Sequence, residues 1–141
     1  MATFLLKTEP GDYSYDELVR DKSTTWSGVT SNAALAALRT ARPGDEAFIY
    51  HTGDERAIVG LAKVTSAPRE DPANRGLTPK GEPKFAVIDL APLRRAKTHV
   101  TLAQIKADAR FTEFALVKQA RLSVMPVPPA LDKALRALAG L

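Results

Sequence analysis

Lysine, threonine and glutamate stand consecutively near the start of the chain, at Lys7, Thr8 and Glu9. These residue types at the end of a strand could be a solvated edge, or they could supply the polar groups of a binding pocket. Side chains alternate along a strand, so Lys7 and Glu9 would share one face of a sheet and Thr8 would take the other. Pro10 has no N–H and would end the strand. The pattern therefore leaves two readings open, the polar floor of a pocket and, as the simpler one, a solvated strand edge.

A second candidate surrounds Trp26, the only tryptophan, in the sequence TTWSGVTSN. Gly28 could adopt an unusual φ or allow close approach to the backbone, and Thr30 or Ser31 could cap the helix expected after it. An indole beside a helix N-terminus offers a stacking surface and N–H donors, which suit flat bases and their phosphates. A tryptophan packed in the core before a well-capped helix would explain the same residues.

The segment GDEAFIYHTG at 44–53 predicts a strand between two turns. Alternation places Phe48 and Tyr50 on one face and Ile49 and His51 on the other. We expect Phe48 in the core. Tyr50 or His51 could reach a pocket at the strand end because each carries polar atoms on a flat ring. A half-buried tyrosine and a surface histidine are the alternative.

Other chemistry-bearing residues give weaker indications. His51 and His99 are the only histidines, and their contexts show no metal-ligand spacing, so we expect no metal. There is no glycine-rich phosphate loop and no Gly-x-Ser-x-Gly motif, and we expect no cofactor. Phe111 and Phe114 have the spacing of packed helical residues. The basic run LRRAKTH at 93–99 is expected to be a loop, either solvated or touching phosphates.

Composition indicates one globular domain spanning residues 1–141. The chain is 45% hydrophobic and 26% charged, with a net charge of +4 that mildly favours polyanionic partners. It contains no cysteine, which excludes disulfides and thiolate metal sites. No apolar run is long enough for a membrane span, and the N-terminus lacks the pattern of a signal peptide. We therefore expect a cytoplasmic protein with no membrane contact, while its oligomeric state stays open.

The pattern of elements predicts an α+β fold. Short runs rich in branched and aromatic residues predict strands, and they are 3–7, 46–51, 57–65, 84–93 and 120–127. Four helices are expected after Ser14, over 32–40, after Thr101, and after Pro128-Pro129, where Leu131, Leu135 and Leu138 have helical spacing and Gly140 is the stop. The proline-rich segment 67–83 is expected to be an exposed loop. Strands and helices do not alternate strictly, so a small, mostly antiparallel barrel or curved sheet flanked by helices fits better than a doubly wound parallel sheet.

An ordered series of blocks along nearly the whole chain resembles the EVE domain family. The blocks are KTEP at 7–10, YSYDEL at 13–18, WSGV at 26–29, GDEAFIYHTG at 44–53, IVGLAKV at 58–64, VIDLAPL at 87–93, VTLAQIKAD at 100–108 and LVKQARLSVMPV at 116–127. The resemblance implies a PUA-like fold, a small β-barrel with helices, similar to that of the YTH readers of methylated adenine. It also implies a module that binds DNA or RNA and holds a modified base, with modified cytosine as the expected class.

The resemblance further implies a ligand site from three matching segments. They comprise Lys7, Thr8, Glu9 and Pro10, then Trp26, Ser27, Gly28 and Val29 with Thr30 and Ser31 after them, and finally Tyr50, His51 and Thr52. In this hypothesis Trp26 stacks on the base, Glu9 accepts from an exocyclic amine and Lys7 donates to a base oxygen or phosphate.

The chain also departs from the family pattern. Where the family has Arg-Asn and then Ala-Arg-Asn, this chain has Thr30-Ser31 and Ala34-Leu35-Ala36, so two arginines and two amides are missing beside the expected site. Two alternatives therefore stay open. One is an amidohydrolase like those of other PUA-like proteins, which would need Lys7, Thr8 and Glu9 to converge. The other is a protein-interaction domain with a vestigial pocket.

Overall fold

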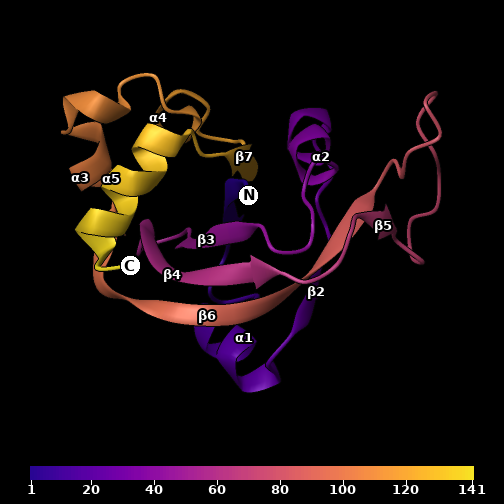
Figure 1. Cartoon of the computed structure of the whole chain (residues 1–141), viewed down its shortest axis with the longest axis horizontal. Helices are drawn as coiled ribbons and strands as arrows, with labels where there is room; N and C mark the ends of the chain where they lie inside the picture. The colour runs from indigo at the N-terminus through magenta and orange to yellow at the C-terminus, as the bar shows by residue number, and fades with distance from the viewer.

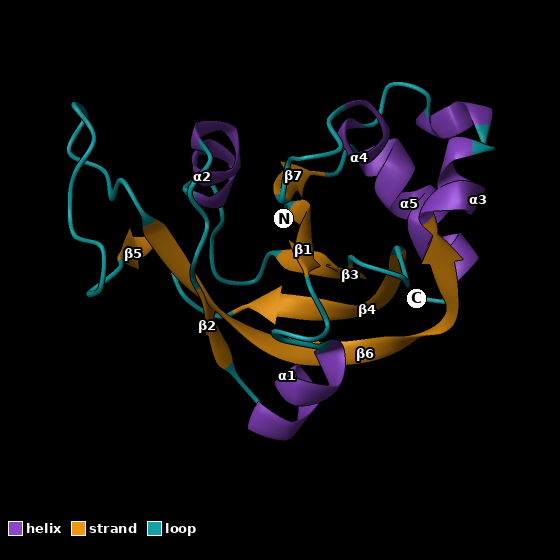
Figure 2. Ribbon diagram, turned by 180° about the vertical axis from the view of Figure 1, so that it is seen from behind, coloured by secondary structure: helices purple, strands orange, loops and turns teal.

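The computed structural model describes residues 1–141 and shows one curled sheet with helices around it (Figures 1 and 2). The strands are β1 (Thr3–Thr8), β2 (Thr24–Trp26), β3 (Glu46–His51), β4 (Ala57–Val64), β5 (Arg69–Glu70), β6 (Ala86–Thr101) and β7 (Val124–Pro126). The helices are α1 (Tyr15–Asp21), α2 (Asn32–Leu38), α3 (Leu102–Lys106), α4 (Ala115–Lys118) and α5 (Pro129–Ala139), with a 3₁₀ turn η1 (Ala109–Phe111). No helix has the length and hydropathy needed to cross a membrane.

The sheet is mixed and forms a half-barrel. Its order is β2-β6-β4-β3-β1-β7, with β5 pairing to β6 beside that path. Only β1 and β3 run parallel, and every other pair is antiparallel. The two terminal strands, β2 and β7, have three residues each and do not pair with one another, so the barrel does not close. The α+β class and the mostly antiparallel sheet are confirmed, whereas the expected barrel is only half formed.

Helices lie on both sides of the curled sheet. In Figures 1 and 2, α3, α4 and α5 gather at one end, α2 stands at the other, and α1 lies across β6 from the remaining helices. Helix α1 begins with a capping box, in which the Ser14 hydroxyl accepts from the Glu17 N–H and the Glu17 carboxylate accepts from the Ser14 N–H. Ser31, one of the two expected cap residues, caps α2, and Thr101 caps α3, each with one bond from its side chain.

Strand β1 divides the interior into two hydrophobic clusters. Phe4 and Leu6 pack in one cluster with Trp26, while Leu5 packs in the other with Phe48. Both faces of β1 are therefore buried, unlike those of a strand with one solvated face. Because side chains alternate, Thr8 continues the face of the Trp26 cluster and Lys7 continues the opposite face.

Tyr15 connects α1 to the sheet. The side chain is almost fully buried, and its hydroxyl oxygen lies 2.7 Å from the Leu61 carbonyl oxygen and 2.9 Å from that of Arg94, so the two acceptors share its single proton. Gly60 leaves space for the ring, since a Cβ there would lie 2.6 Å from Tyr15 ring carbons. The β3–β4 register shifts next to this glycine. The start of α1 is thus fixed against β4 and β6.

Several element boundaries differ from the sequence-based expectation. The strand expected at 84–93 begins at Ala86 and continues to Thr101, so the basic run 93–99 is strand and not loop. The side chains of the run 93–99 alternate little in hydropathy because most of them are exposed. Strands β2 and β5 were not predicted, since they are too short to show a period of two. Phe111 and Phe114 are buried in the core, as predicted.

Candidate functional site

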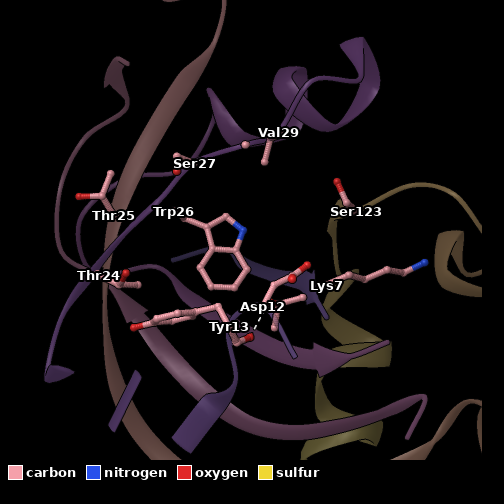
Figure 3. Close-up of a pocket in the computed structure, with 11 residues that line it drawn as sticks. Lys7, Asp12, Tyr13, Thr24, Thr25, Trp26, Ser27, Val29 and Ser123 are labelled. Atoms are coloured by element: carbon pink, nitrogen blue, oxygen red, sulfur yellow. Dashed lines mark hydrogen bonds between the residues drawn. The ribbon is translucent and has the colours of Figure 1, made fainter. Parts of the chain in front are cut away.

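A cavity of about 360 Å³ opens beside Trp26, and we call it the Trp26 cavity (Figure 3). Its walls come from the end of β1, the loop before α1, strand β2, the segment that follows it, and the loop before β7. The lining residues are Lys7, Thr8, Asp12, Tyr13, Thr24, Thr25, Trp26, Ser27, Gly28, Val29 and Ser123. Six of the thirteen residues expected at the site are among them: Lys7, Thr8, Trp26, Ser27, Gly28 and Val29.

Two aromatic rings form a corner of the Trp26 cavity. The rings of Tyr13 and Trp26 meet edge to face, with centroids 6.4 Å apart and planes at 81°. The Tyr13 hydroxyl donates to the Asp21 carboxylate at 2.9 Å, which fixes this ring against α1. Burial is the main cause that raises the pKa of Tyr13 above its usual value. The indole N–H of Trp26 has no acceptor in the protein, yet no buried polar side-chain atom lacks a partner, so this N–H is accessible to solvent. The corner thus offers a stacking face and a free donor.

Asp12 supplies the only carboxylate of the Trp26 cavity. Its side chain forms no ion pair or hydrogen bond, and in Figure 3 the carboxylate points into the space between Trp26 and Ser123. The hydroxyls of Ser27 and Ser123 also have no partner in the protein, whereas that of Thr25 donates to Asp89 at 2.7 Å. The cavity therefore combines a free acceptor with uncommitted hydroxyls around an aromatic corner, which suits a flat ligand that carries an amine.

Lys7 and Glu9 do not present their charged groups to the Trp26 cavity. The Lys7 ammonium points away from Trp26 in Figure 3 and donates to the Ala120 carbonyl oxygen at 2.9 Å. The Glu9 carboxylate accepts from the Gly11 N–H, at 3.1 Å, and from the Thr52 hydroxyl, at 3.3 Å. The alternation predicted for β1 is present, but it directs these two side chains to the face opposite Trp26.

Thr8 is the β1 residue that faces the Trp26 cavity. Its hydroxyl donates to the Tyr13 carbonyl oxygen at 2.6 Å and so holds the loop that carries Asp12 and Tyr13. A hydrolytic triad of Lys7, Thr8 and Glu9 would need the three groups to converge. Thr8 lies on the other face and its proton is already donated, so the three groups do not form that arrangement. Pro10 follows β1 in a turn and lies outside the cavity.

The segment after Trp26 contributes backbone to the site. Gly28 has φ of +80°, and a Cβ there would meet no atom within 4 Å, so glycine is favoured by conformation and not by space. Val29 lines the Trp26 cavity, while Thr30 lies beside a smaller neighbouring cavity. Ser31 caps α2, with its hydroxyl accepting from the Ala34 N–H at 3.1 Å.

Tyr50, His51 and Thr52 lie outside the Trp26 cavity. Tyr50 is buried on the opposite face of the sheet, with its ring 5.8 Å from the Lys7 ammonium. Burial raises the pKa of Tyr50, and the nearby charge of Arg56 partly opposes that rise. The Thr52 N–H donates to the Thr8 carbonyl oxygen at 2.9 Å, which extends the β1–β3 pairing past the strand ends.

His51 is a buried structural residue that positions the site. Its Nε2 accepts from the Tyr15 N–H at 3.0 Å, and its Nδ1 lies 3.2 Å from a Glu55 carboxylate oxygen. Because Nε2 accepts, the proton of the neutral ring is on Nδ1 and is donated to Glu55. The histidine thus joins β3 to the first residue of α1, directly after the loop that carries Asp12 and Tyr13.

Replacing His51 with alanine is expected to lower the free energy of unfolding by about 1–3 kcal/mol, because the Tyr15 N–H loses its acceptor in a buried position. Urea denaturation followed by circular dichroism measures the change. His99→Ala is the matched control, since His99 is exposed and should shift the midpoint little. Equal effects of the two replacements would contradict this role for His51.

Sequence reasoning missed five lining residues, namely Asp12, Tyr13, Thr24, Thr25 and Ser123. A signal for the first two was present, since an acidic and an aromatic residue follow the turn after Pro10. Ser123 is adjacent to the site only because β7 pairs with β1, and its carbonyl oxygen accepts from the Lys7 N–H at 2.9 Å. Because Ser123 and Lys7 are far apart in the chain, no local sequence pattern predicts this contact.

Comparison with known proteins identifies relatives over nearly the whole chain. A family profile described as EVE domain matches residues 2–138. Thymocyte nuclear protein 1 of Gallus gallus is 28% identical over 152 residues, which cover 88% of this chain and 63% of the relative. The chain therefore spans somewhat less than two thirds of that relative's length.

Solved structures share the fold. A Rhodopseudomonas palustris protein solved by NMR is 34% identical, with a TM-score of 0.89 over 99% of this chain and 94% of that one. The human THYN1 protein, solved in complex with 5-methylcytosine containing DNA, also has a TM-score of 0.89, over 100% of this chain and 99% of that one. Its 23% identity shows a common fold and nothing more specific.

Proposed function

The chain belongs to the EVE domain family, and from this membership and the geometry of the Trp26 cavity we propose that it binds a modified, cytosine-type base of a nucleic acid. The observation that carries the proposal is the unpaired carboxylate of Asp12 in a cavity whose corner is made by Trp26 and Tyr13. The human THYN1 protein, which has the same fold, was crystallised with 5-methylcytosine containing DNA, and this supports the same ligand class here.

Each part of a cytosine ring has a complement in the Trp26 cavity. The ring stacks on Trp26, and aromatic stacking is tolerant of substituents on the base. Asp12 accepts from the exocyclic N4 amine, as carboxylates do when they recognise cytosine. The carbonyl O2 takes a hydrogen bond from the indole N–H or from a free serine hydroxyl. We therefore assign to Asp12 the acceptor role that the sequence suggested for Glu9.

The proposed ligand reaches the cavity only when its base is unstacked. A base inside a duplex hides both its ring faces and part of its edge, so it must be flipped out or lie in a single strand. The arginines that the family has after the Trp26 segment are absent here, which removes phosphate contacts. Each missing contact lowers the salt dependence of binding by about one unit of slope. Recognition in this chain rests on the base more than on the backbone.

A fluorescence titration tests the proposal, with Trp26 as the sole tryptophan reporter. Single-stranded and duplex oligonucleotides carry plain, 5-methyl, 5-hydroxymethyl or N4-acetyl cytosine, or N6-methyladenine, at two salt concentrations. We expect quenching that is selective for one modified cytosine. Asp12→Asn should weaken this binding about tenfold or more, because a hydrogen bond to a charged group is worth about 1.5–3 kcal/mol.

Asp54→Asn is the matched control for Asp12→Asn. It makes the same change of charge at an exposed residue that lies outside the Trp26 cavity, and it should leave the affinity unchanged. No spectral change with any oligonucleotide at low salt would overturn the proposal and favour a protein-interaction domain with a vestigial pocket.

A further inference from the structure

A second cavity, of about 450 Å³, lies on the opposite face of β1, and we call it the cationic cavity. Three of its lining residues are cations, Lys7, Arg56 and Lys106, and no acidic side chain lines it. These cations come from three separate elements: the end of β1, the turn before β4 and the end of α3. A cavity with three positive charges and no counter-charge has the electrostatics of an anion site.

None of the three cations forms an ion pair. The Lys7 ammonium has one hydrogen-bond acceptor in the protein, the Ala120 carbonyl oxygen, and two of its protons are uncommitted. Its partial burial lowers the pKa of Lys7 below the usual value, a cost that a bound anion would offset. Arg56 donates only its Nε–H, to the Gly53 carbonyl oxygen at 3.2 Å, and leaves both terminal nitrogens free.

The backbone of Arg56 is held in an uncommon conformation. Its φ is +44°, in the left-handed region that non-glycine residues rarely occupy. The Arg56 carbonyl oxygen accepts from the Leu102 N–H at 2.7 Å, so the turn is joined to the start of α3, the helix that carries Lys106. This bond fixes Arg56 relative to Lys106. Strained residues of this kind cluster at ligand sites.

The cationic cavity also has an aliphatic wall, and Glu9, which approaches Gly53 in the lining, is already engaged. Leu102, Leu116 and Val117 form an aliphatic wall. Glu9 is bonded to the Thr52 hydroxyl and the Gly11 N–H, and it lies outside the lining. The cavity therefore suits an anionic group attached to an organic body and not a simple ion alone.

We propose that the cationic cavity binds the sugar phosphate of a nucleotide, with the phosphate between Lys7, Arg56 and Lys106 and the sugar against the aliphatic wall. The two free nitrogens of Arg56 can hold two phosphate oxygens at once, and the lysines add point charges. The nucleotide is either free or part of a strand, since both present the same group. The site needs no base and is independent of the Trp26 cavity, although the stem of Lys7 lines both.

Calorimetric titration at low salt tests this site with three probes that lack a base: inorganic phosphate, ribose 5-phosphate, and a short abasic sugar-phosphate strand. We expect ribose 5-phosphate to bind more tightly than inorganic phosphate. Lys106→Glu and Arg56→Ala should each weaken binding about tenfold or more, since each removes a charged hydrogen-bond donor. Lys133→Glu is the matched control, because it makes the same charge change as Lys106→Glu at an exposed residue outside both cavities.

The outcomes separate the cationic cavity from the Trp26 cavity, and a free nucleotide from a nucleic-acid strand as the ligand. Trp26→Leu, which fills most of the space of the indole, should leave the binding of ribose 5-phosphate unchanged, so failure of the base proposal would not affect the phosphate proposal. Binding by the abasic strand and not by ribose 5-phosphate would assign the site to a strand, and the reverse would assign it to a free nucleotide. No heat with any probe, or equal losses in Lys106→Glu and Lys133→Glu, would overturn the proposal.

Discussion

Replacing Trp26 with alanine is expected to weaken binding of the modified base by roughly 5- to 150-fold, the equivalent of about 1–3 kcal/mol of lost stacking. The indole is the largest flat surface of the Trp26 cavity, and Tyr13 meets it edge to face. Removing the indole leaves Tyr13 without its partner and the base without a stacking face. Fluorescence anisotropy of a labelled oligonucleotide measures the change, because the variant has no tryptophan to quench.

Loss of binding must be separated from loss of folding. Trp26 is only 9% exposed and packs in the cluster that includes Phe4 and Leu6, so the alanine variant also leaves a void in the core. Trp26→Leu fills most of that space but offers no aromatic face, and it should remain folded while binding as poorly as the alanine variant. Trp26→Phe should fall between Leu and the native protein. A leucine variant that binds as tightly as the native protein would exclude stacking as the basis of recognition.

The sequence was informative where a site residue is positioned by its neighbours in the chain. Trp26, Gly28 and Val29 lie together in one short segment, and Gly28 has the unusual φ that its place in that segment suggested. The Ser14 cap follows from spacing alone, and the α2 cap was narrowed to Thr30 or Ser31, because a cap acts within one turn of its helix. Local chemistry of this kind can be read without knowledge of the fold.

The sequence alone could not decide which face of β1 meets Trp26. The alternation of Lys7 and Thr8 was predicted correctly, but Leu5 and Leu6 are both buried, so hydropathy does not distinguish the two faces. Only the pairing of β1 with β3 and β7 decides that Thr8 faces the Trp26 cavity. Asp12 was not predicted as a site residue, because it reaches the cavity from a turn after β1 and the position of that turn depends on the fold.

His51 shows a related limit. A histidine at a strand end near glycine and threonine has the sequence context of a ligand residue or a surface residue, yet it is buried against the backbone of Tyr15. The contact joins residues far apart in the chain and involves an N–H that every residue except proline carries. No side-chain pattern signals such a bond. The basic run 93–99 is likewise strand because β4 pairs with it at Arg94 and Arg95 and again beyond it at Val100.

Replacing Arg136 with methionine is expected to lower the free energy of unfolding by about 2–4 kcal/mol, more than any exposed ion pair of this protein would. The guanidinium donates to Glu46 on β3 and to Asp132 on α5, both at 2.7 Å, and lies 5.6 Å from the Phe48 ring centroid. Asp132 also accepts from the Thr3 hydroxyl at 3.0 Å. One arginine thus joins the C-terminal helix to the starts of β1 and β3.

The size of the effect follows from burial. The side chain of Arg136 is only 23% exposed, and those of Glu46 and Asp132 are 18% and 22% exposed. Removing the cation therefore leaves two carboxylates poorly solvated and close together. Methionine keeps most of the apolar stem, which isolates the loss of charge from the loss of packing.

Arg20→Met is the matched control for Arg136→Met. Arg20 also contacts two acids, Glu17 and Asp21, but its side chain is 66% exposed and solvent screens the pairs. We expect its urea midpoint to stay near that of the native protein, while the midpoint of Arg136→Met falls. Equal midpoints for the two variants would mean that only the apolar face of α5, with residues such as Leu135, holds the helix to the sheet. The ion pairs of Arg136 would then fix the position of α5 without adding to the free energy of unfolding.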